Sequence, residues 1–463
     1  MRSERMLTIL LLWSAFSAVK PATIESAGQE ILPKGQLIDT VVCRARQDQG
    51  YALYLPSHYD PGRRWPVLYC FDPGARGKVP VELFREAAER YGYILAGSNN
   101  SRNGPNGQNT ESMIAMTDDT RERLSIDPAR CFAAGMSGGA RVACGFALGG
   151  APFAGVVAFA AGFPGAQTPG KIPFFLFGAA GTDDFNYPEL RRLDGELEKV
   201  GATKRIVTFE GEHGWPPASI CTQAIEWLEL QSMKAGARER DPELIEALFE
   251  KAAAAIRAAE ASHNPGESYL LTKSASEDFR GLRDVSALAA RAAQMADSRE
   301  VRRYLQDERD QEETQNRRQW ELLARWNQRF DGEAVPSFAA LMSELKRQSE
   351  ARADSPVRRI ARRTLQGTYI HAHEQSRVLA ERKDFSAAVQ MLQLAASIHP
   401  ERQQVHFNLA AIYARAKDRK NALSALKKAA SLGFHDVAAI ERDRSFDFLR
   451  ADPAFTKLLG GMK

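Results

Sequence analysis

Residues 131–139 read Cys-Phe-Ala-Ala-Gly-Met-Ser-Gly-Gly, a short apolar run that leads into a serine enclosed by glycines. The spacing Gly135-x-Ser137-x-Gly139 is typical of a nucleophile elbow, a sharp turn from a strand into a helix that leaves the serine strained and exposed. Glycines are needed there because a side chain would clash with the strand or the helix. A glycine-rich turn with an incidental serine gives the same pattern, in roughly one of ten chains of this length. Other parts of the chain must therefore decide between the two interpretations.

Short apolar runs alternate with helix-length segments between residues 36 and 231. The expected strands are 37–43, 51–55, 66–71, 92–96, 131–134, 154–160, 172–177 and 205–209. The first two read as a pair joined by turn residues. Apolar strands that alternate with helices predict an α/β domain with a doubly wound, mostly parallel sheet that is buried on both faces. Ligands bind at the carboxyl ends of such strands, where Ser137 follows one of them.

The second half of the chain has a different pattern, rich in alanine, arginine and glutamate at helical spacing. This pattern predicts a helical region over 240–365 and a repeat over 366–463. The repeat is carried by Ala388, Leu392, Ala395 and Pro400, which recur 34 positions later as Ala422, Leu426, Ala429 and Phe434. It resembles the tetratricopeptide repeat, with a degenerate capping repeat at the end, although Gln375 and Ser376 depart from the pattern. Such helix pairs more often bind a partner than catalyse. We therefore expect a partner protein or the substrate itself to bind this all-α domain.

The amino terminus has the composition of a signal peptide. Arg2 and Arg5 precede an apolar stretch over 6–19 that is short for a membrane span, and small residues offer a cleavage site near Ala18. We therefore expect residues 1–18 to be removed and the protein to be exported, to the periplasm or outside the cell. No later segment approaches membrane-spanning length, so we expect no transmembrane segment in the mature chain.

Composition bounds the remaining classes of function. The 463 residues are 44% apolar and 26% charged, as in globular proteins of two or more domains. A net charge of +4 is too small to argue for nucleic acid as a partner. No Cys-x-x-Cys pair, His-Glu-x-x-His helix or Walker loop occurs, so neither a metal nor a cofactor is indicated.

Five cysteines lie in the first half of the chain: Cys43, Cys70, Cys131, Cys144 and Cys221. Export would permit disulfides, but an odd number excludes complete pairing within the chain. Most of the five lie inside apolar runs, which is typical of buried thiols.

A serine nucleophile needs a base, usually a histidine that an acid orients. In the fold that carries this elbow the chain order is serine, acid, histidine. His58 precedes the serine, so His213 is the candidate base. The acid is expected after the strand that ends near Phe177, where Asp183 and Asp184 are both available. One of these aspartates could instead cap the next helix.

These motifs together resemble α/β-hydrolases of the polyhydroxybutyrate depolymerase and feruloyl esterase type over about residues 36–230. The residues that carry the resemblance are Ile126–Arg130, Gly135–Gly139, Gly181–Asp184 and His213–Pro216. The resemblance implies a serine esterase with Ser137 as nucleophile and His213 as base. Its Gly-Thr-x-Asp motif places Asp184 rather than Asp183 in the acid position.

The loop after the third strand departs from that family, which often has His-Gly there to complete the oxyanion hole. This chain has Asp-Pro-Gly-Ala over 72–75, and proline has no N–H. The expected donors are therefore the N–H of Gly138, the residue after the nucleophile, and that of Gly74 or Ala75.

Three further residues are candidate substrate contacts. Asn99 and Asn100 follow another strand, and Trp215 lies beside the candidate base. A polar loop without a role and ordinary packing of the tryptophan explain these residues equally well.

The sequence thus predicts an exported serine hydrolase that cleaves carboxylic esters through an acyl-enzyme. A serine peptidase on the same fold and an inactive interaction scaffold are the alternatives. The intact serine, aspartate and histidine argue against the scaffold, because decay would remove one of them first. All three precede residue 230, so we expect a fragment that ends near Gln231 to fold and to hydrolyse small esters.

Overall fold

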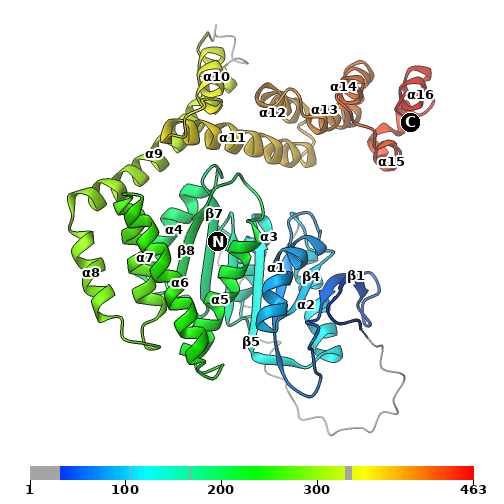
Figure 1. Cartoon of the computed structure of the whole chain (residues 1–463). Coiled ribbons are helices and arrows are strands. Elements are labelled where there is room, and N and C mark those ends of the chain that lie inside the picture. The colour runs from blue at the N-terminus through cyan, green and yellow to red at the C-terminus, as the bar shows by residue number, and fades with distance from the viewer. Residues whose placement is uncertain (1–31, 105, 166–167, 329–335, 463) are drawn as a thin grey trace, which may run out of the picture.

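The computed structural model describes residues 32–104, 106–165, 168–328 and 336–462 (Figure 1). The signal peptide expected over residues 1–18 lies outside the described residues. An α/β half is followed by a helical half whose helices α9 to α16 run above it in the view of Figure 1.

One eight-stranded sheet forms the centre of the α/β half, in the order β1-β2-β4-β3-β5-β6-β7-β8. Pairing is antiparallel between β1 and β2 and between β2 and β4, and parallel elsewhere. The strands are β1 Leu37–Val42, β2 Gly50–Tyr54, β3 Trp65–Phe71, β4 Ile94–Ser98, β5 Ile126–Met136, β6 Gly155–Phe159, β7 Phe175–Gly181 and β8 Lys204–Phe209. The carboxyl ends of the six parallel strands therefore lie along one edge, as the alternating pattern predicted.

Helices cover both faces of this sheet because its strands are apolar on both sides. In β5, Ala133 belongs to one core layer, whereas Phe132 and Ala134 belong to the other. The first layer is covered by α2 (Asn106–Arg123), α3 (Gly138–Leu148) and α4 (Tyr187–Lys199). The second is covered by α1 (Lys78–Tyr91) and α5 (Ala218–Lys234). The α/β class expected from the sequence is confirmed.

Only helices follow β8 among the described residues, first α5 and then the helices of the second half. They are α6 Pro242–Ala261, α7 Pro265–Asp278, α8 Ser286–Ala296, α9 Arg299–Gln328, α10 Pro336–Ser349, α11 Pro356–Glu381, α12 Phe385–Ile398, α13 Gln403–Arg415, α14 Arg419–Ser431, α15 Val437–Arg442, the 3₁₀ turn η1 Arg444–Leu449 and α16 Pro453–Gly460. None of the helices in the described ranges is long and apolar enough to cross a membrane.

The 34-residue repeat expected from the sequence has a geometric counterpart. Lys383 and Lys417 both adopt left-handed backbone angles, with φ of 66° and 62°. The next residues, Asp384 and Asp418, both cap a helix through their side chains. The second half is therefore helical and locally repetitive, and its assignment to the tetratricopeptide family stays a prediction.

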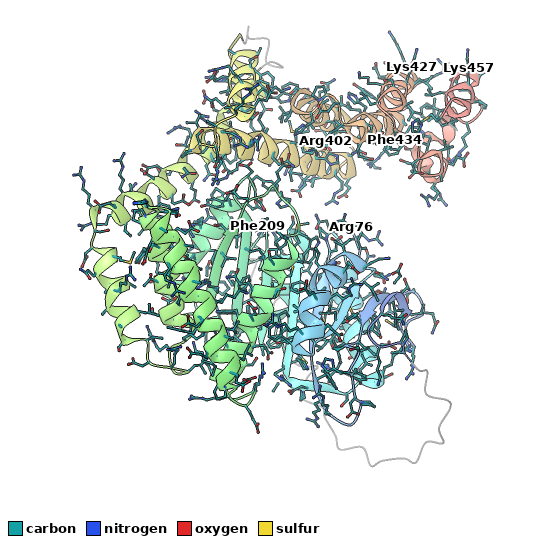
Figure 2. The ribbon with its side chains drawn as sticks, viewed as in Figure 1. Arg76, Phe209, Arg402, Lys427, Phe434 and Lys457 are labelled. Atoms are coloured by element: carbon teal, nitrogen blue, oxygen red, sulfur yellow. The ribbon has the colours of Figure 1, made fainter. Side chains whose placement is uncertain are left out.

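The later helices of the second half, from α10 on, lie beyond the carboxyl edge of the sheet, whereas α6 and α7 pack against α5. Figure 2 marks this edge by Arg76, which follows β3, and by Phe209, which ends β8. Both lie on the side of the α/β half that faces Arg402, at the N-terminal cap of α13, and Phe434, between α14 and α15. The edge where the ligand site is expected is thus next to helices from the other half of the chain.

All five cysteines are buried free thiols. Burial raises the pKa of Cys43 and of Cys131 to about 11 and that of Cys144 to about 12. Thiols in this state are poor nucleophiles, so they serve as small apolar side chains of the core.

Candidate active site

The turn from β5 into α3 has the geometry of an elbow. Ser137 adopts φ 54° and ψ −119°, a region that residues other than glycine rarely occupy. A Cβ at Gly135 would lie 2.2 Å from the backbone of Gly139, and one at Gly139 would lie 1.9 Å from the carbonyl oxygen of Phe71. The two glycines flanking the serine are therefore required by close packing, and the strained serine expected from the pattern is present.

Ser137, His213 and Asp184 form a continuous hydrogen-bonded series. Ser137 Oγ lies 3.0 Å from His213 Nε2, and His213 Nδ1 lies 2.8 Å from Asp184 Oδ1. Asp184 is fully buried, and its Oδ1 also accepts a 2.8 Å bond from the N–H of Asn186. With its proton on Nδ1, the imidazole donates to the carboxylate and accepts from the serine hydroxyl. The three residues that the sequence singled out are brought together in the order that nucleophilic catalysis requires.

Asp183, the alternative acid, points in another direction. Its Oδ2 pairs with Arg362 Nη1 of α11 at 2.7 Å, and its N–H donates to Gly211 O at 2.8 Å. The two adjacent aspartates of this turn thus face different partners. Asp184, and not its neighbour, contacts His213.

The second oxyanion donor expected from the sequence is not available. The N–H of Gly74 donates to Asp72 Oδ1 at 2.8 Å, and that of Ala75 donates to Asp72 O at 3.1 Å. Asp72 is buried, and burial acts to raise its pKa. Hydrogen bonds from Arg76 and Trp215 outweigh this effect and hold the pKa below its usual range. The turn therefore uses its own N–H groups to hold a structural carboxylate.

Asn103 lies beside the remaining expected donor, Gly138. Gly138 begins α3, so its N–H is among those that a helix leaves free at its N-terminus. A Cβ at Gly138 would lie 1.7 Å from Asn103 Oδ1, which means that the amide fills the space next to this glycine. The sequence pointed to the loop that contains Asn103 but selected other asparagines in it.

Those asparagines, Asn99 and Asn100, hold the loop to the first two strands. Asn99 Nδ2 donates to Asp39 O at 3.0 Å. Asn100 accepts from the Gly50 N–H at 2.8 Å and donates to Asp48 O at 3.0 Å. Neither lines the cavity at Ser137. Their expected role in substrate binding stays a prediction.

Trp215 also has a structural place. Its indole N–H donates to Asp72 Oδ2 at 2.8 Å, and its ring packs edge-on against Phe159 at 5.8 Å. It does not line the cavity at Ser137, and its expected role as a pocket wall stays a prediction.

A cavity of about 710 Å³ opens at Ser137 and Gly138. This volume is in the range of ligand sites. Apolar side chains line part of it: Val142, Phe146, Pro164, Phe185, Ile370 and Val378. Charged and amide side chains line much of the rest: Arg102, Asn103, Asn109, Arg141, Asn186, Glu374, Gln375 and Arg377. Residues 370–378 belong to α11, so the helical half forms a wall of the cavity, contrary to the expected division between the halves.

Phe185 was missed by the sequence analysis. Its ring lies 4.2 Å from that of His213, between centroids, and it lines the cavity. Its position directly after Asp184 was the available signal, because a loop that presents the acid also presents its neighbours.

The topology and the site together define the fold. The elbow follows the central parallel strand β5, the aspartate follows β7 and the histidine follows β8. The second strand is antiparallel to its neighbours. The fold of this half is that of an α/β-hydrolase.

Comparison with known proteins finds likeness in structure alone. No protein-family model and no curated protein matches the chain. An S-formylglutathione hydrolase from Staphylococcus aureus matches at 14% identity over 39% of this chain and 90% of its own, with a TM-score of 0.32. A ferulic acid esterase matches at 16% identity over 42% and 97%, with a TM-score of 0.36. Esterase 2 of Thermogutta terrifontis, in its apo form, matches at 16% identity over 44% and 96%, with a TM-score of 0.35.

Proposed function

We propose that the chain is a serine hydrolase that cleaves carboxylic esters through an acyl-enzyme. The observation that supports this proposal most directly is the hydrogen-bonded series from Ser137 through His213 to Asp184. Its serine lies on a strained elbow at the mouth of a ligand-sized cavity. A serine and a histidine without a shared catalytic role would not need to be held in hydrogen-bonded contact at a strained turn.

In the acylation step, His213 Nε2 takes the hydroxyl proton as Ser137 Oγ attacks the ester carbonyl carbon. The buried carboxylate of Asp184 holds the ring in the required tautomer and stabilises the imidazolium. The imidazolium then returns the proton to the departing alcohol. In deacylation, water loses a proton to His213, attacks the acyl-enzyme and releases the acid and the free serine.

The tetrahedral intermediate carries a negative charge on the former carbonyl oxygen. We assign its stabilisation to the N–H of Gly138 and to the amide of Asn103, which fills the space beside that glycine. The positive end of α3 adds to this effect because its N-terminus begins at Gly138. Such donors are worth about 3–4 kcal/mol each in comparable sites.

The test compares the full-length protein with Ser137→Ala on acetyl, butyryl and feruloyl esters and on a peptide amide. We expect measurable ester turnover, little amide turnover and a loss of at least about a thousandfold in the variant. Wild-type rates in Ser137→Ala would rule out this function. Amide turnover that exceeds ester turnover would favour the peptidase.

We further propose that the protein is exported after cleavage of residues 1–18. The basic start and the apolar stretch over 6–19 support this proposal. Amino-terminal sequencing of the protein from extracytoplasmic fractions should find a start close to residue 19. Full-length protein confined to the cytoplasm would contradict export.

A further inference from the structure

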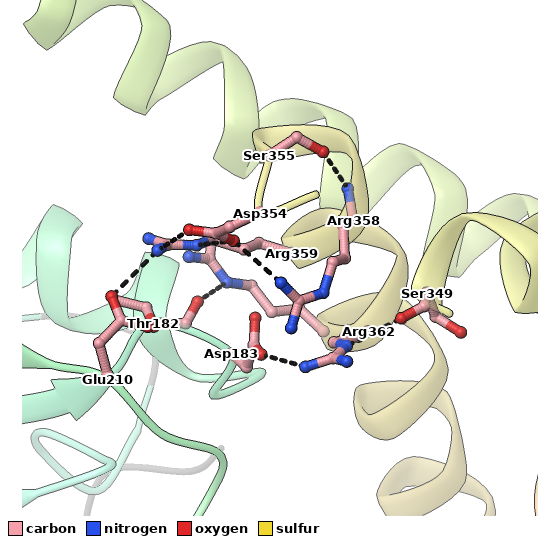
Figure 3. Close-up of polar contacts among 10 residues, drawn as sticks. Thr182, Asp183, Glu210, Ser349, Asp354, Ser355, Arg358, Arg359 and Arg362 are labelled. Carbon is pink, nitrogen blue, oxygen red and sulfur yellow. Dashed lines mark hydrogen bonds and ion pairs between the residues drawn. The ribbon is translucent and has the colours of Figure 1, made fainter. Parts of the chain in front are cut away.

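Three arginines of α11 contact the loops that carry the candidate acid and base. Arg359, Arg362 and Arg363 lie on one face of the helix because residues three and four apart are neighbours there. Arg359 pairs with Glu210 at 3.0 Å, in the segment that leads to His213 (Figure 3). We call these three residues the arginine clamp.

The clamp acts on the residues directly before Asp184. Arg362 Nη1 lies 2.7 Å from Asp183 Oδ2, and Arg363 Nε donates to Thr182 O at 2.7 Å. Figure 3 shows the first of these contacts entering the turn from the side of α11. Side chains of the helical half thus hold the backbone on the amino-terminal side of the acid.

The carboxyl-terminal side of Asp184 is held as well. The guanidinium of Arg363 lies 3.9 Å from the ring centroid of Tyr187, a residue that follows the acid closely. Gln315 of α9 donates to Phe185 O at 2.8 Å, and the ring of Phe185 packs against that of His213 at a tilt of 36°. The helical half therefore brackets the candidate acid from both directions.

Asp184 depends on this support. Its Oδ1 accepts from Asn186 and contacts His213, whereas its Oδ2 has no hydrogen-bond partner among the described residues. The direction of the carboxylate is therefore set by the position of its turn and not by a cage of donors.

Arg363 costs more folding free energy than a contact that only joins the two halves would require. It is 1% exposed, its Nη1 makes no hydrogen bond among the described residues, and burial lowers its pKa. Burying a guanidinium that is only partly paired costs stability. A surface ion pair would fasten the halves at a lower cost.

We propose that the arginine clamp of α11 is a positioning device for catalysis, which holds the turn of Asp184 against His213 and makes turnover depend on the helical half. This inference rests on the proposed ester hydrolysis. A displacement of about 1 Å in such a group can cost about a hundredfold in rate. Arg362 and Arg363 are then positioning residues, because they act through the aspartate and not on substrate.

The experiment uses full-length Arg362→Gln, Asp183→Asn and the double variant. The two single changes remove the same ion pair from its two sides, and Asp183→Asn leaves the bond of Arg362 Nε to Ser349 O intact. Arg358→Gln is the matched control, because Arg358 lies one residue before the clamp and pairs with Asp354 of its own half. Each variant is measured for kcat, KM, pH–rate profile and melting temperature on a 4-nitrophenyl ester.

We expect both single variants to lose about tenfold to a hundredfold in kcat, with a KM within about twofold of the wild-type value. The kcat of the double variant should be no lower than that of the single variants, because both changes remove the same ion pair. The acidic limb of the rate profile should move to lower pH, because a displaced carboxylate stabilises the imidazolium less. Arg358→Gln should match the wild type.

The inference would be overturned if the clamp variants melt at a lower temperature but keep the kcat and the pH profile of Arg358→Gln. The clamp would then contribute to stability alone. If Arg362→Gln fails to fold, the near-isosteric Asp183→Asn decides by the same criteria. Ser137→Ala separates a failure of the proposed ester hydrolysis from a failure of the clamp inference. If Ser137→Ala is as active as the wild type, the proposed function fails. If Ser137→Ala is inactive but the clamp variants keep wild-type kinetics, the inference alone fails.

Discussion

Ser137 shows how a single residue is kept in an unfavourable conformation. Its backbone angles cost of the order of 1–3 kcal/mol, which persists only where the surroundings determine the conformation. Here its N–H donates to Phe159 O at 2.8 Å, and the next turn packs Gly139 directly on the carbonyl of Phe71. The strands on both sides of β5 therefore fix the direction of the serine hydroxyl.

The adjacent aspartates should differ strongly in their effect on rate. Asp184→Asn is expected to lower kcat by about four orders of magnitude, because an amide favours the wrong histidine tautomer. Asp183→Asn should lose at most about a hundredfold, through positioning alone. Steady-state kinetics on one activated ester checks the ranking. The reverse order would mean that Asp183 is the acid in solution.

Asn103 should matter in the transition state and little in substrate binding. Asn103→Ala is expected to lower kcat by about 10²–10³, with a small change in KM, if its amide stabilises the oxyanion. Asn99→Ala serves as the control, because Asn99 belongs to the same loop but bonds to Asp39 outside the cavity. An Asn103→Ala variant as active as Asn99→Ala would exclude the amide from the oxyanion hole.

At the scale of elements, Glu89 joins α1 to the end of β2. Burial acts to raise its pKa, but hydrogen bonds from Ser57 and Tyr54 outweigh burial and lower the pKa from 4.5 to about 2. Because the pKa of Glu89 is lower in the folded than in the unfolded protein, its carboxylate stabilises the fold above about pH 4.3. This stabilisation is lost as the pH falls toward 2. The side chain is 38% exposed, so solvent reduces the contribution to about 1 kcal/mol.

Glu89→Gln should therefore lower the free energy of unfolding by about 1 kcal/mol at pH 7. The difference from the wild type should narrow steadily between pH 4 and pH 2 in denaturant titrations. Glu86→Gln is the control, because Glu86 is exposed on the same helix. A difference that does not change with pH would show that Glu89 acts by packing and not by charge.

The elements that the sequence predicted are those with local signals. The elbow and the alternating strands depend on residues within a few positions of one another. The hydrogen bond from the N–H of Gly74 to Asp72, two residues earlier, was not predicted. No motif of the loop signals that bond.

The role of α11 was missed for a different reason. Arg362 and Asp183 are 179 positions apart, and no sequence pattern in either segment indicates that they are in contact. One local trace existed: Gln375 and Ser376 depart from the repeat pattern in its first copy. Gln375 lines the cavity, which gives this helix face a role other than packing against a neighbouring repeat.

At the scale of the molecule, the two halves share a core. Leu230 and Met233 of α5 pack against Ile245, Leu248 and Phe279 of the helical half. Trp227 donates its indole N–H to Asp278 Oδ1 at 2.7 Å. The outer side of α5 is thus covered by helices that a fragment ending at Gln231 would lack.

These contacts reverse the earlier expectation for that fragment. A protein that ends at Gln231 should be poorly soluble or should melt at least about 10 °C below the full chain, since each kcal/mol lost shifts Tm by about 2–4 °C at this size. Any folded part should turn over esters at most a tenth as fast, because the clamp is gone. Circular dichroism and ester kinetics on both proteins test this. A soluble fragment with full turnover would mean that the halves are independent.

Covalent labelling identifies the nucleophile of the proposed acyl-enzyme. The full-length protein is treated with a fluorophosphonate, digested and examined by mass spectrometry to locate the adduct. We predict one adduct, on Ser137, which is absent in Ser137→Ala and strongly reduced in His213→Ala, because an unassisted hydroxyl is a weak nucleophile. An adduct on another residue, or ester turnover that survives without any adduct on Ser137, would mean that Ser137 is not the nucleophile.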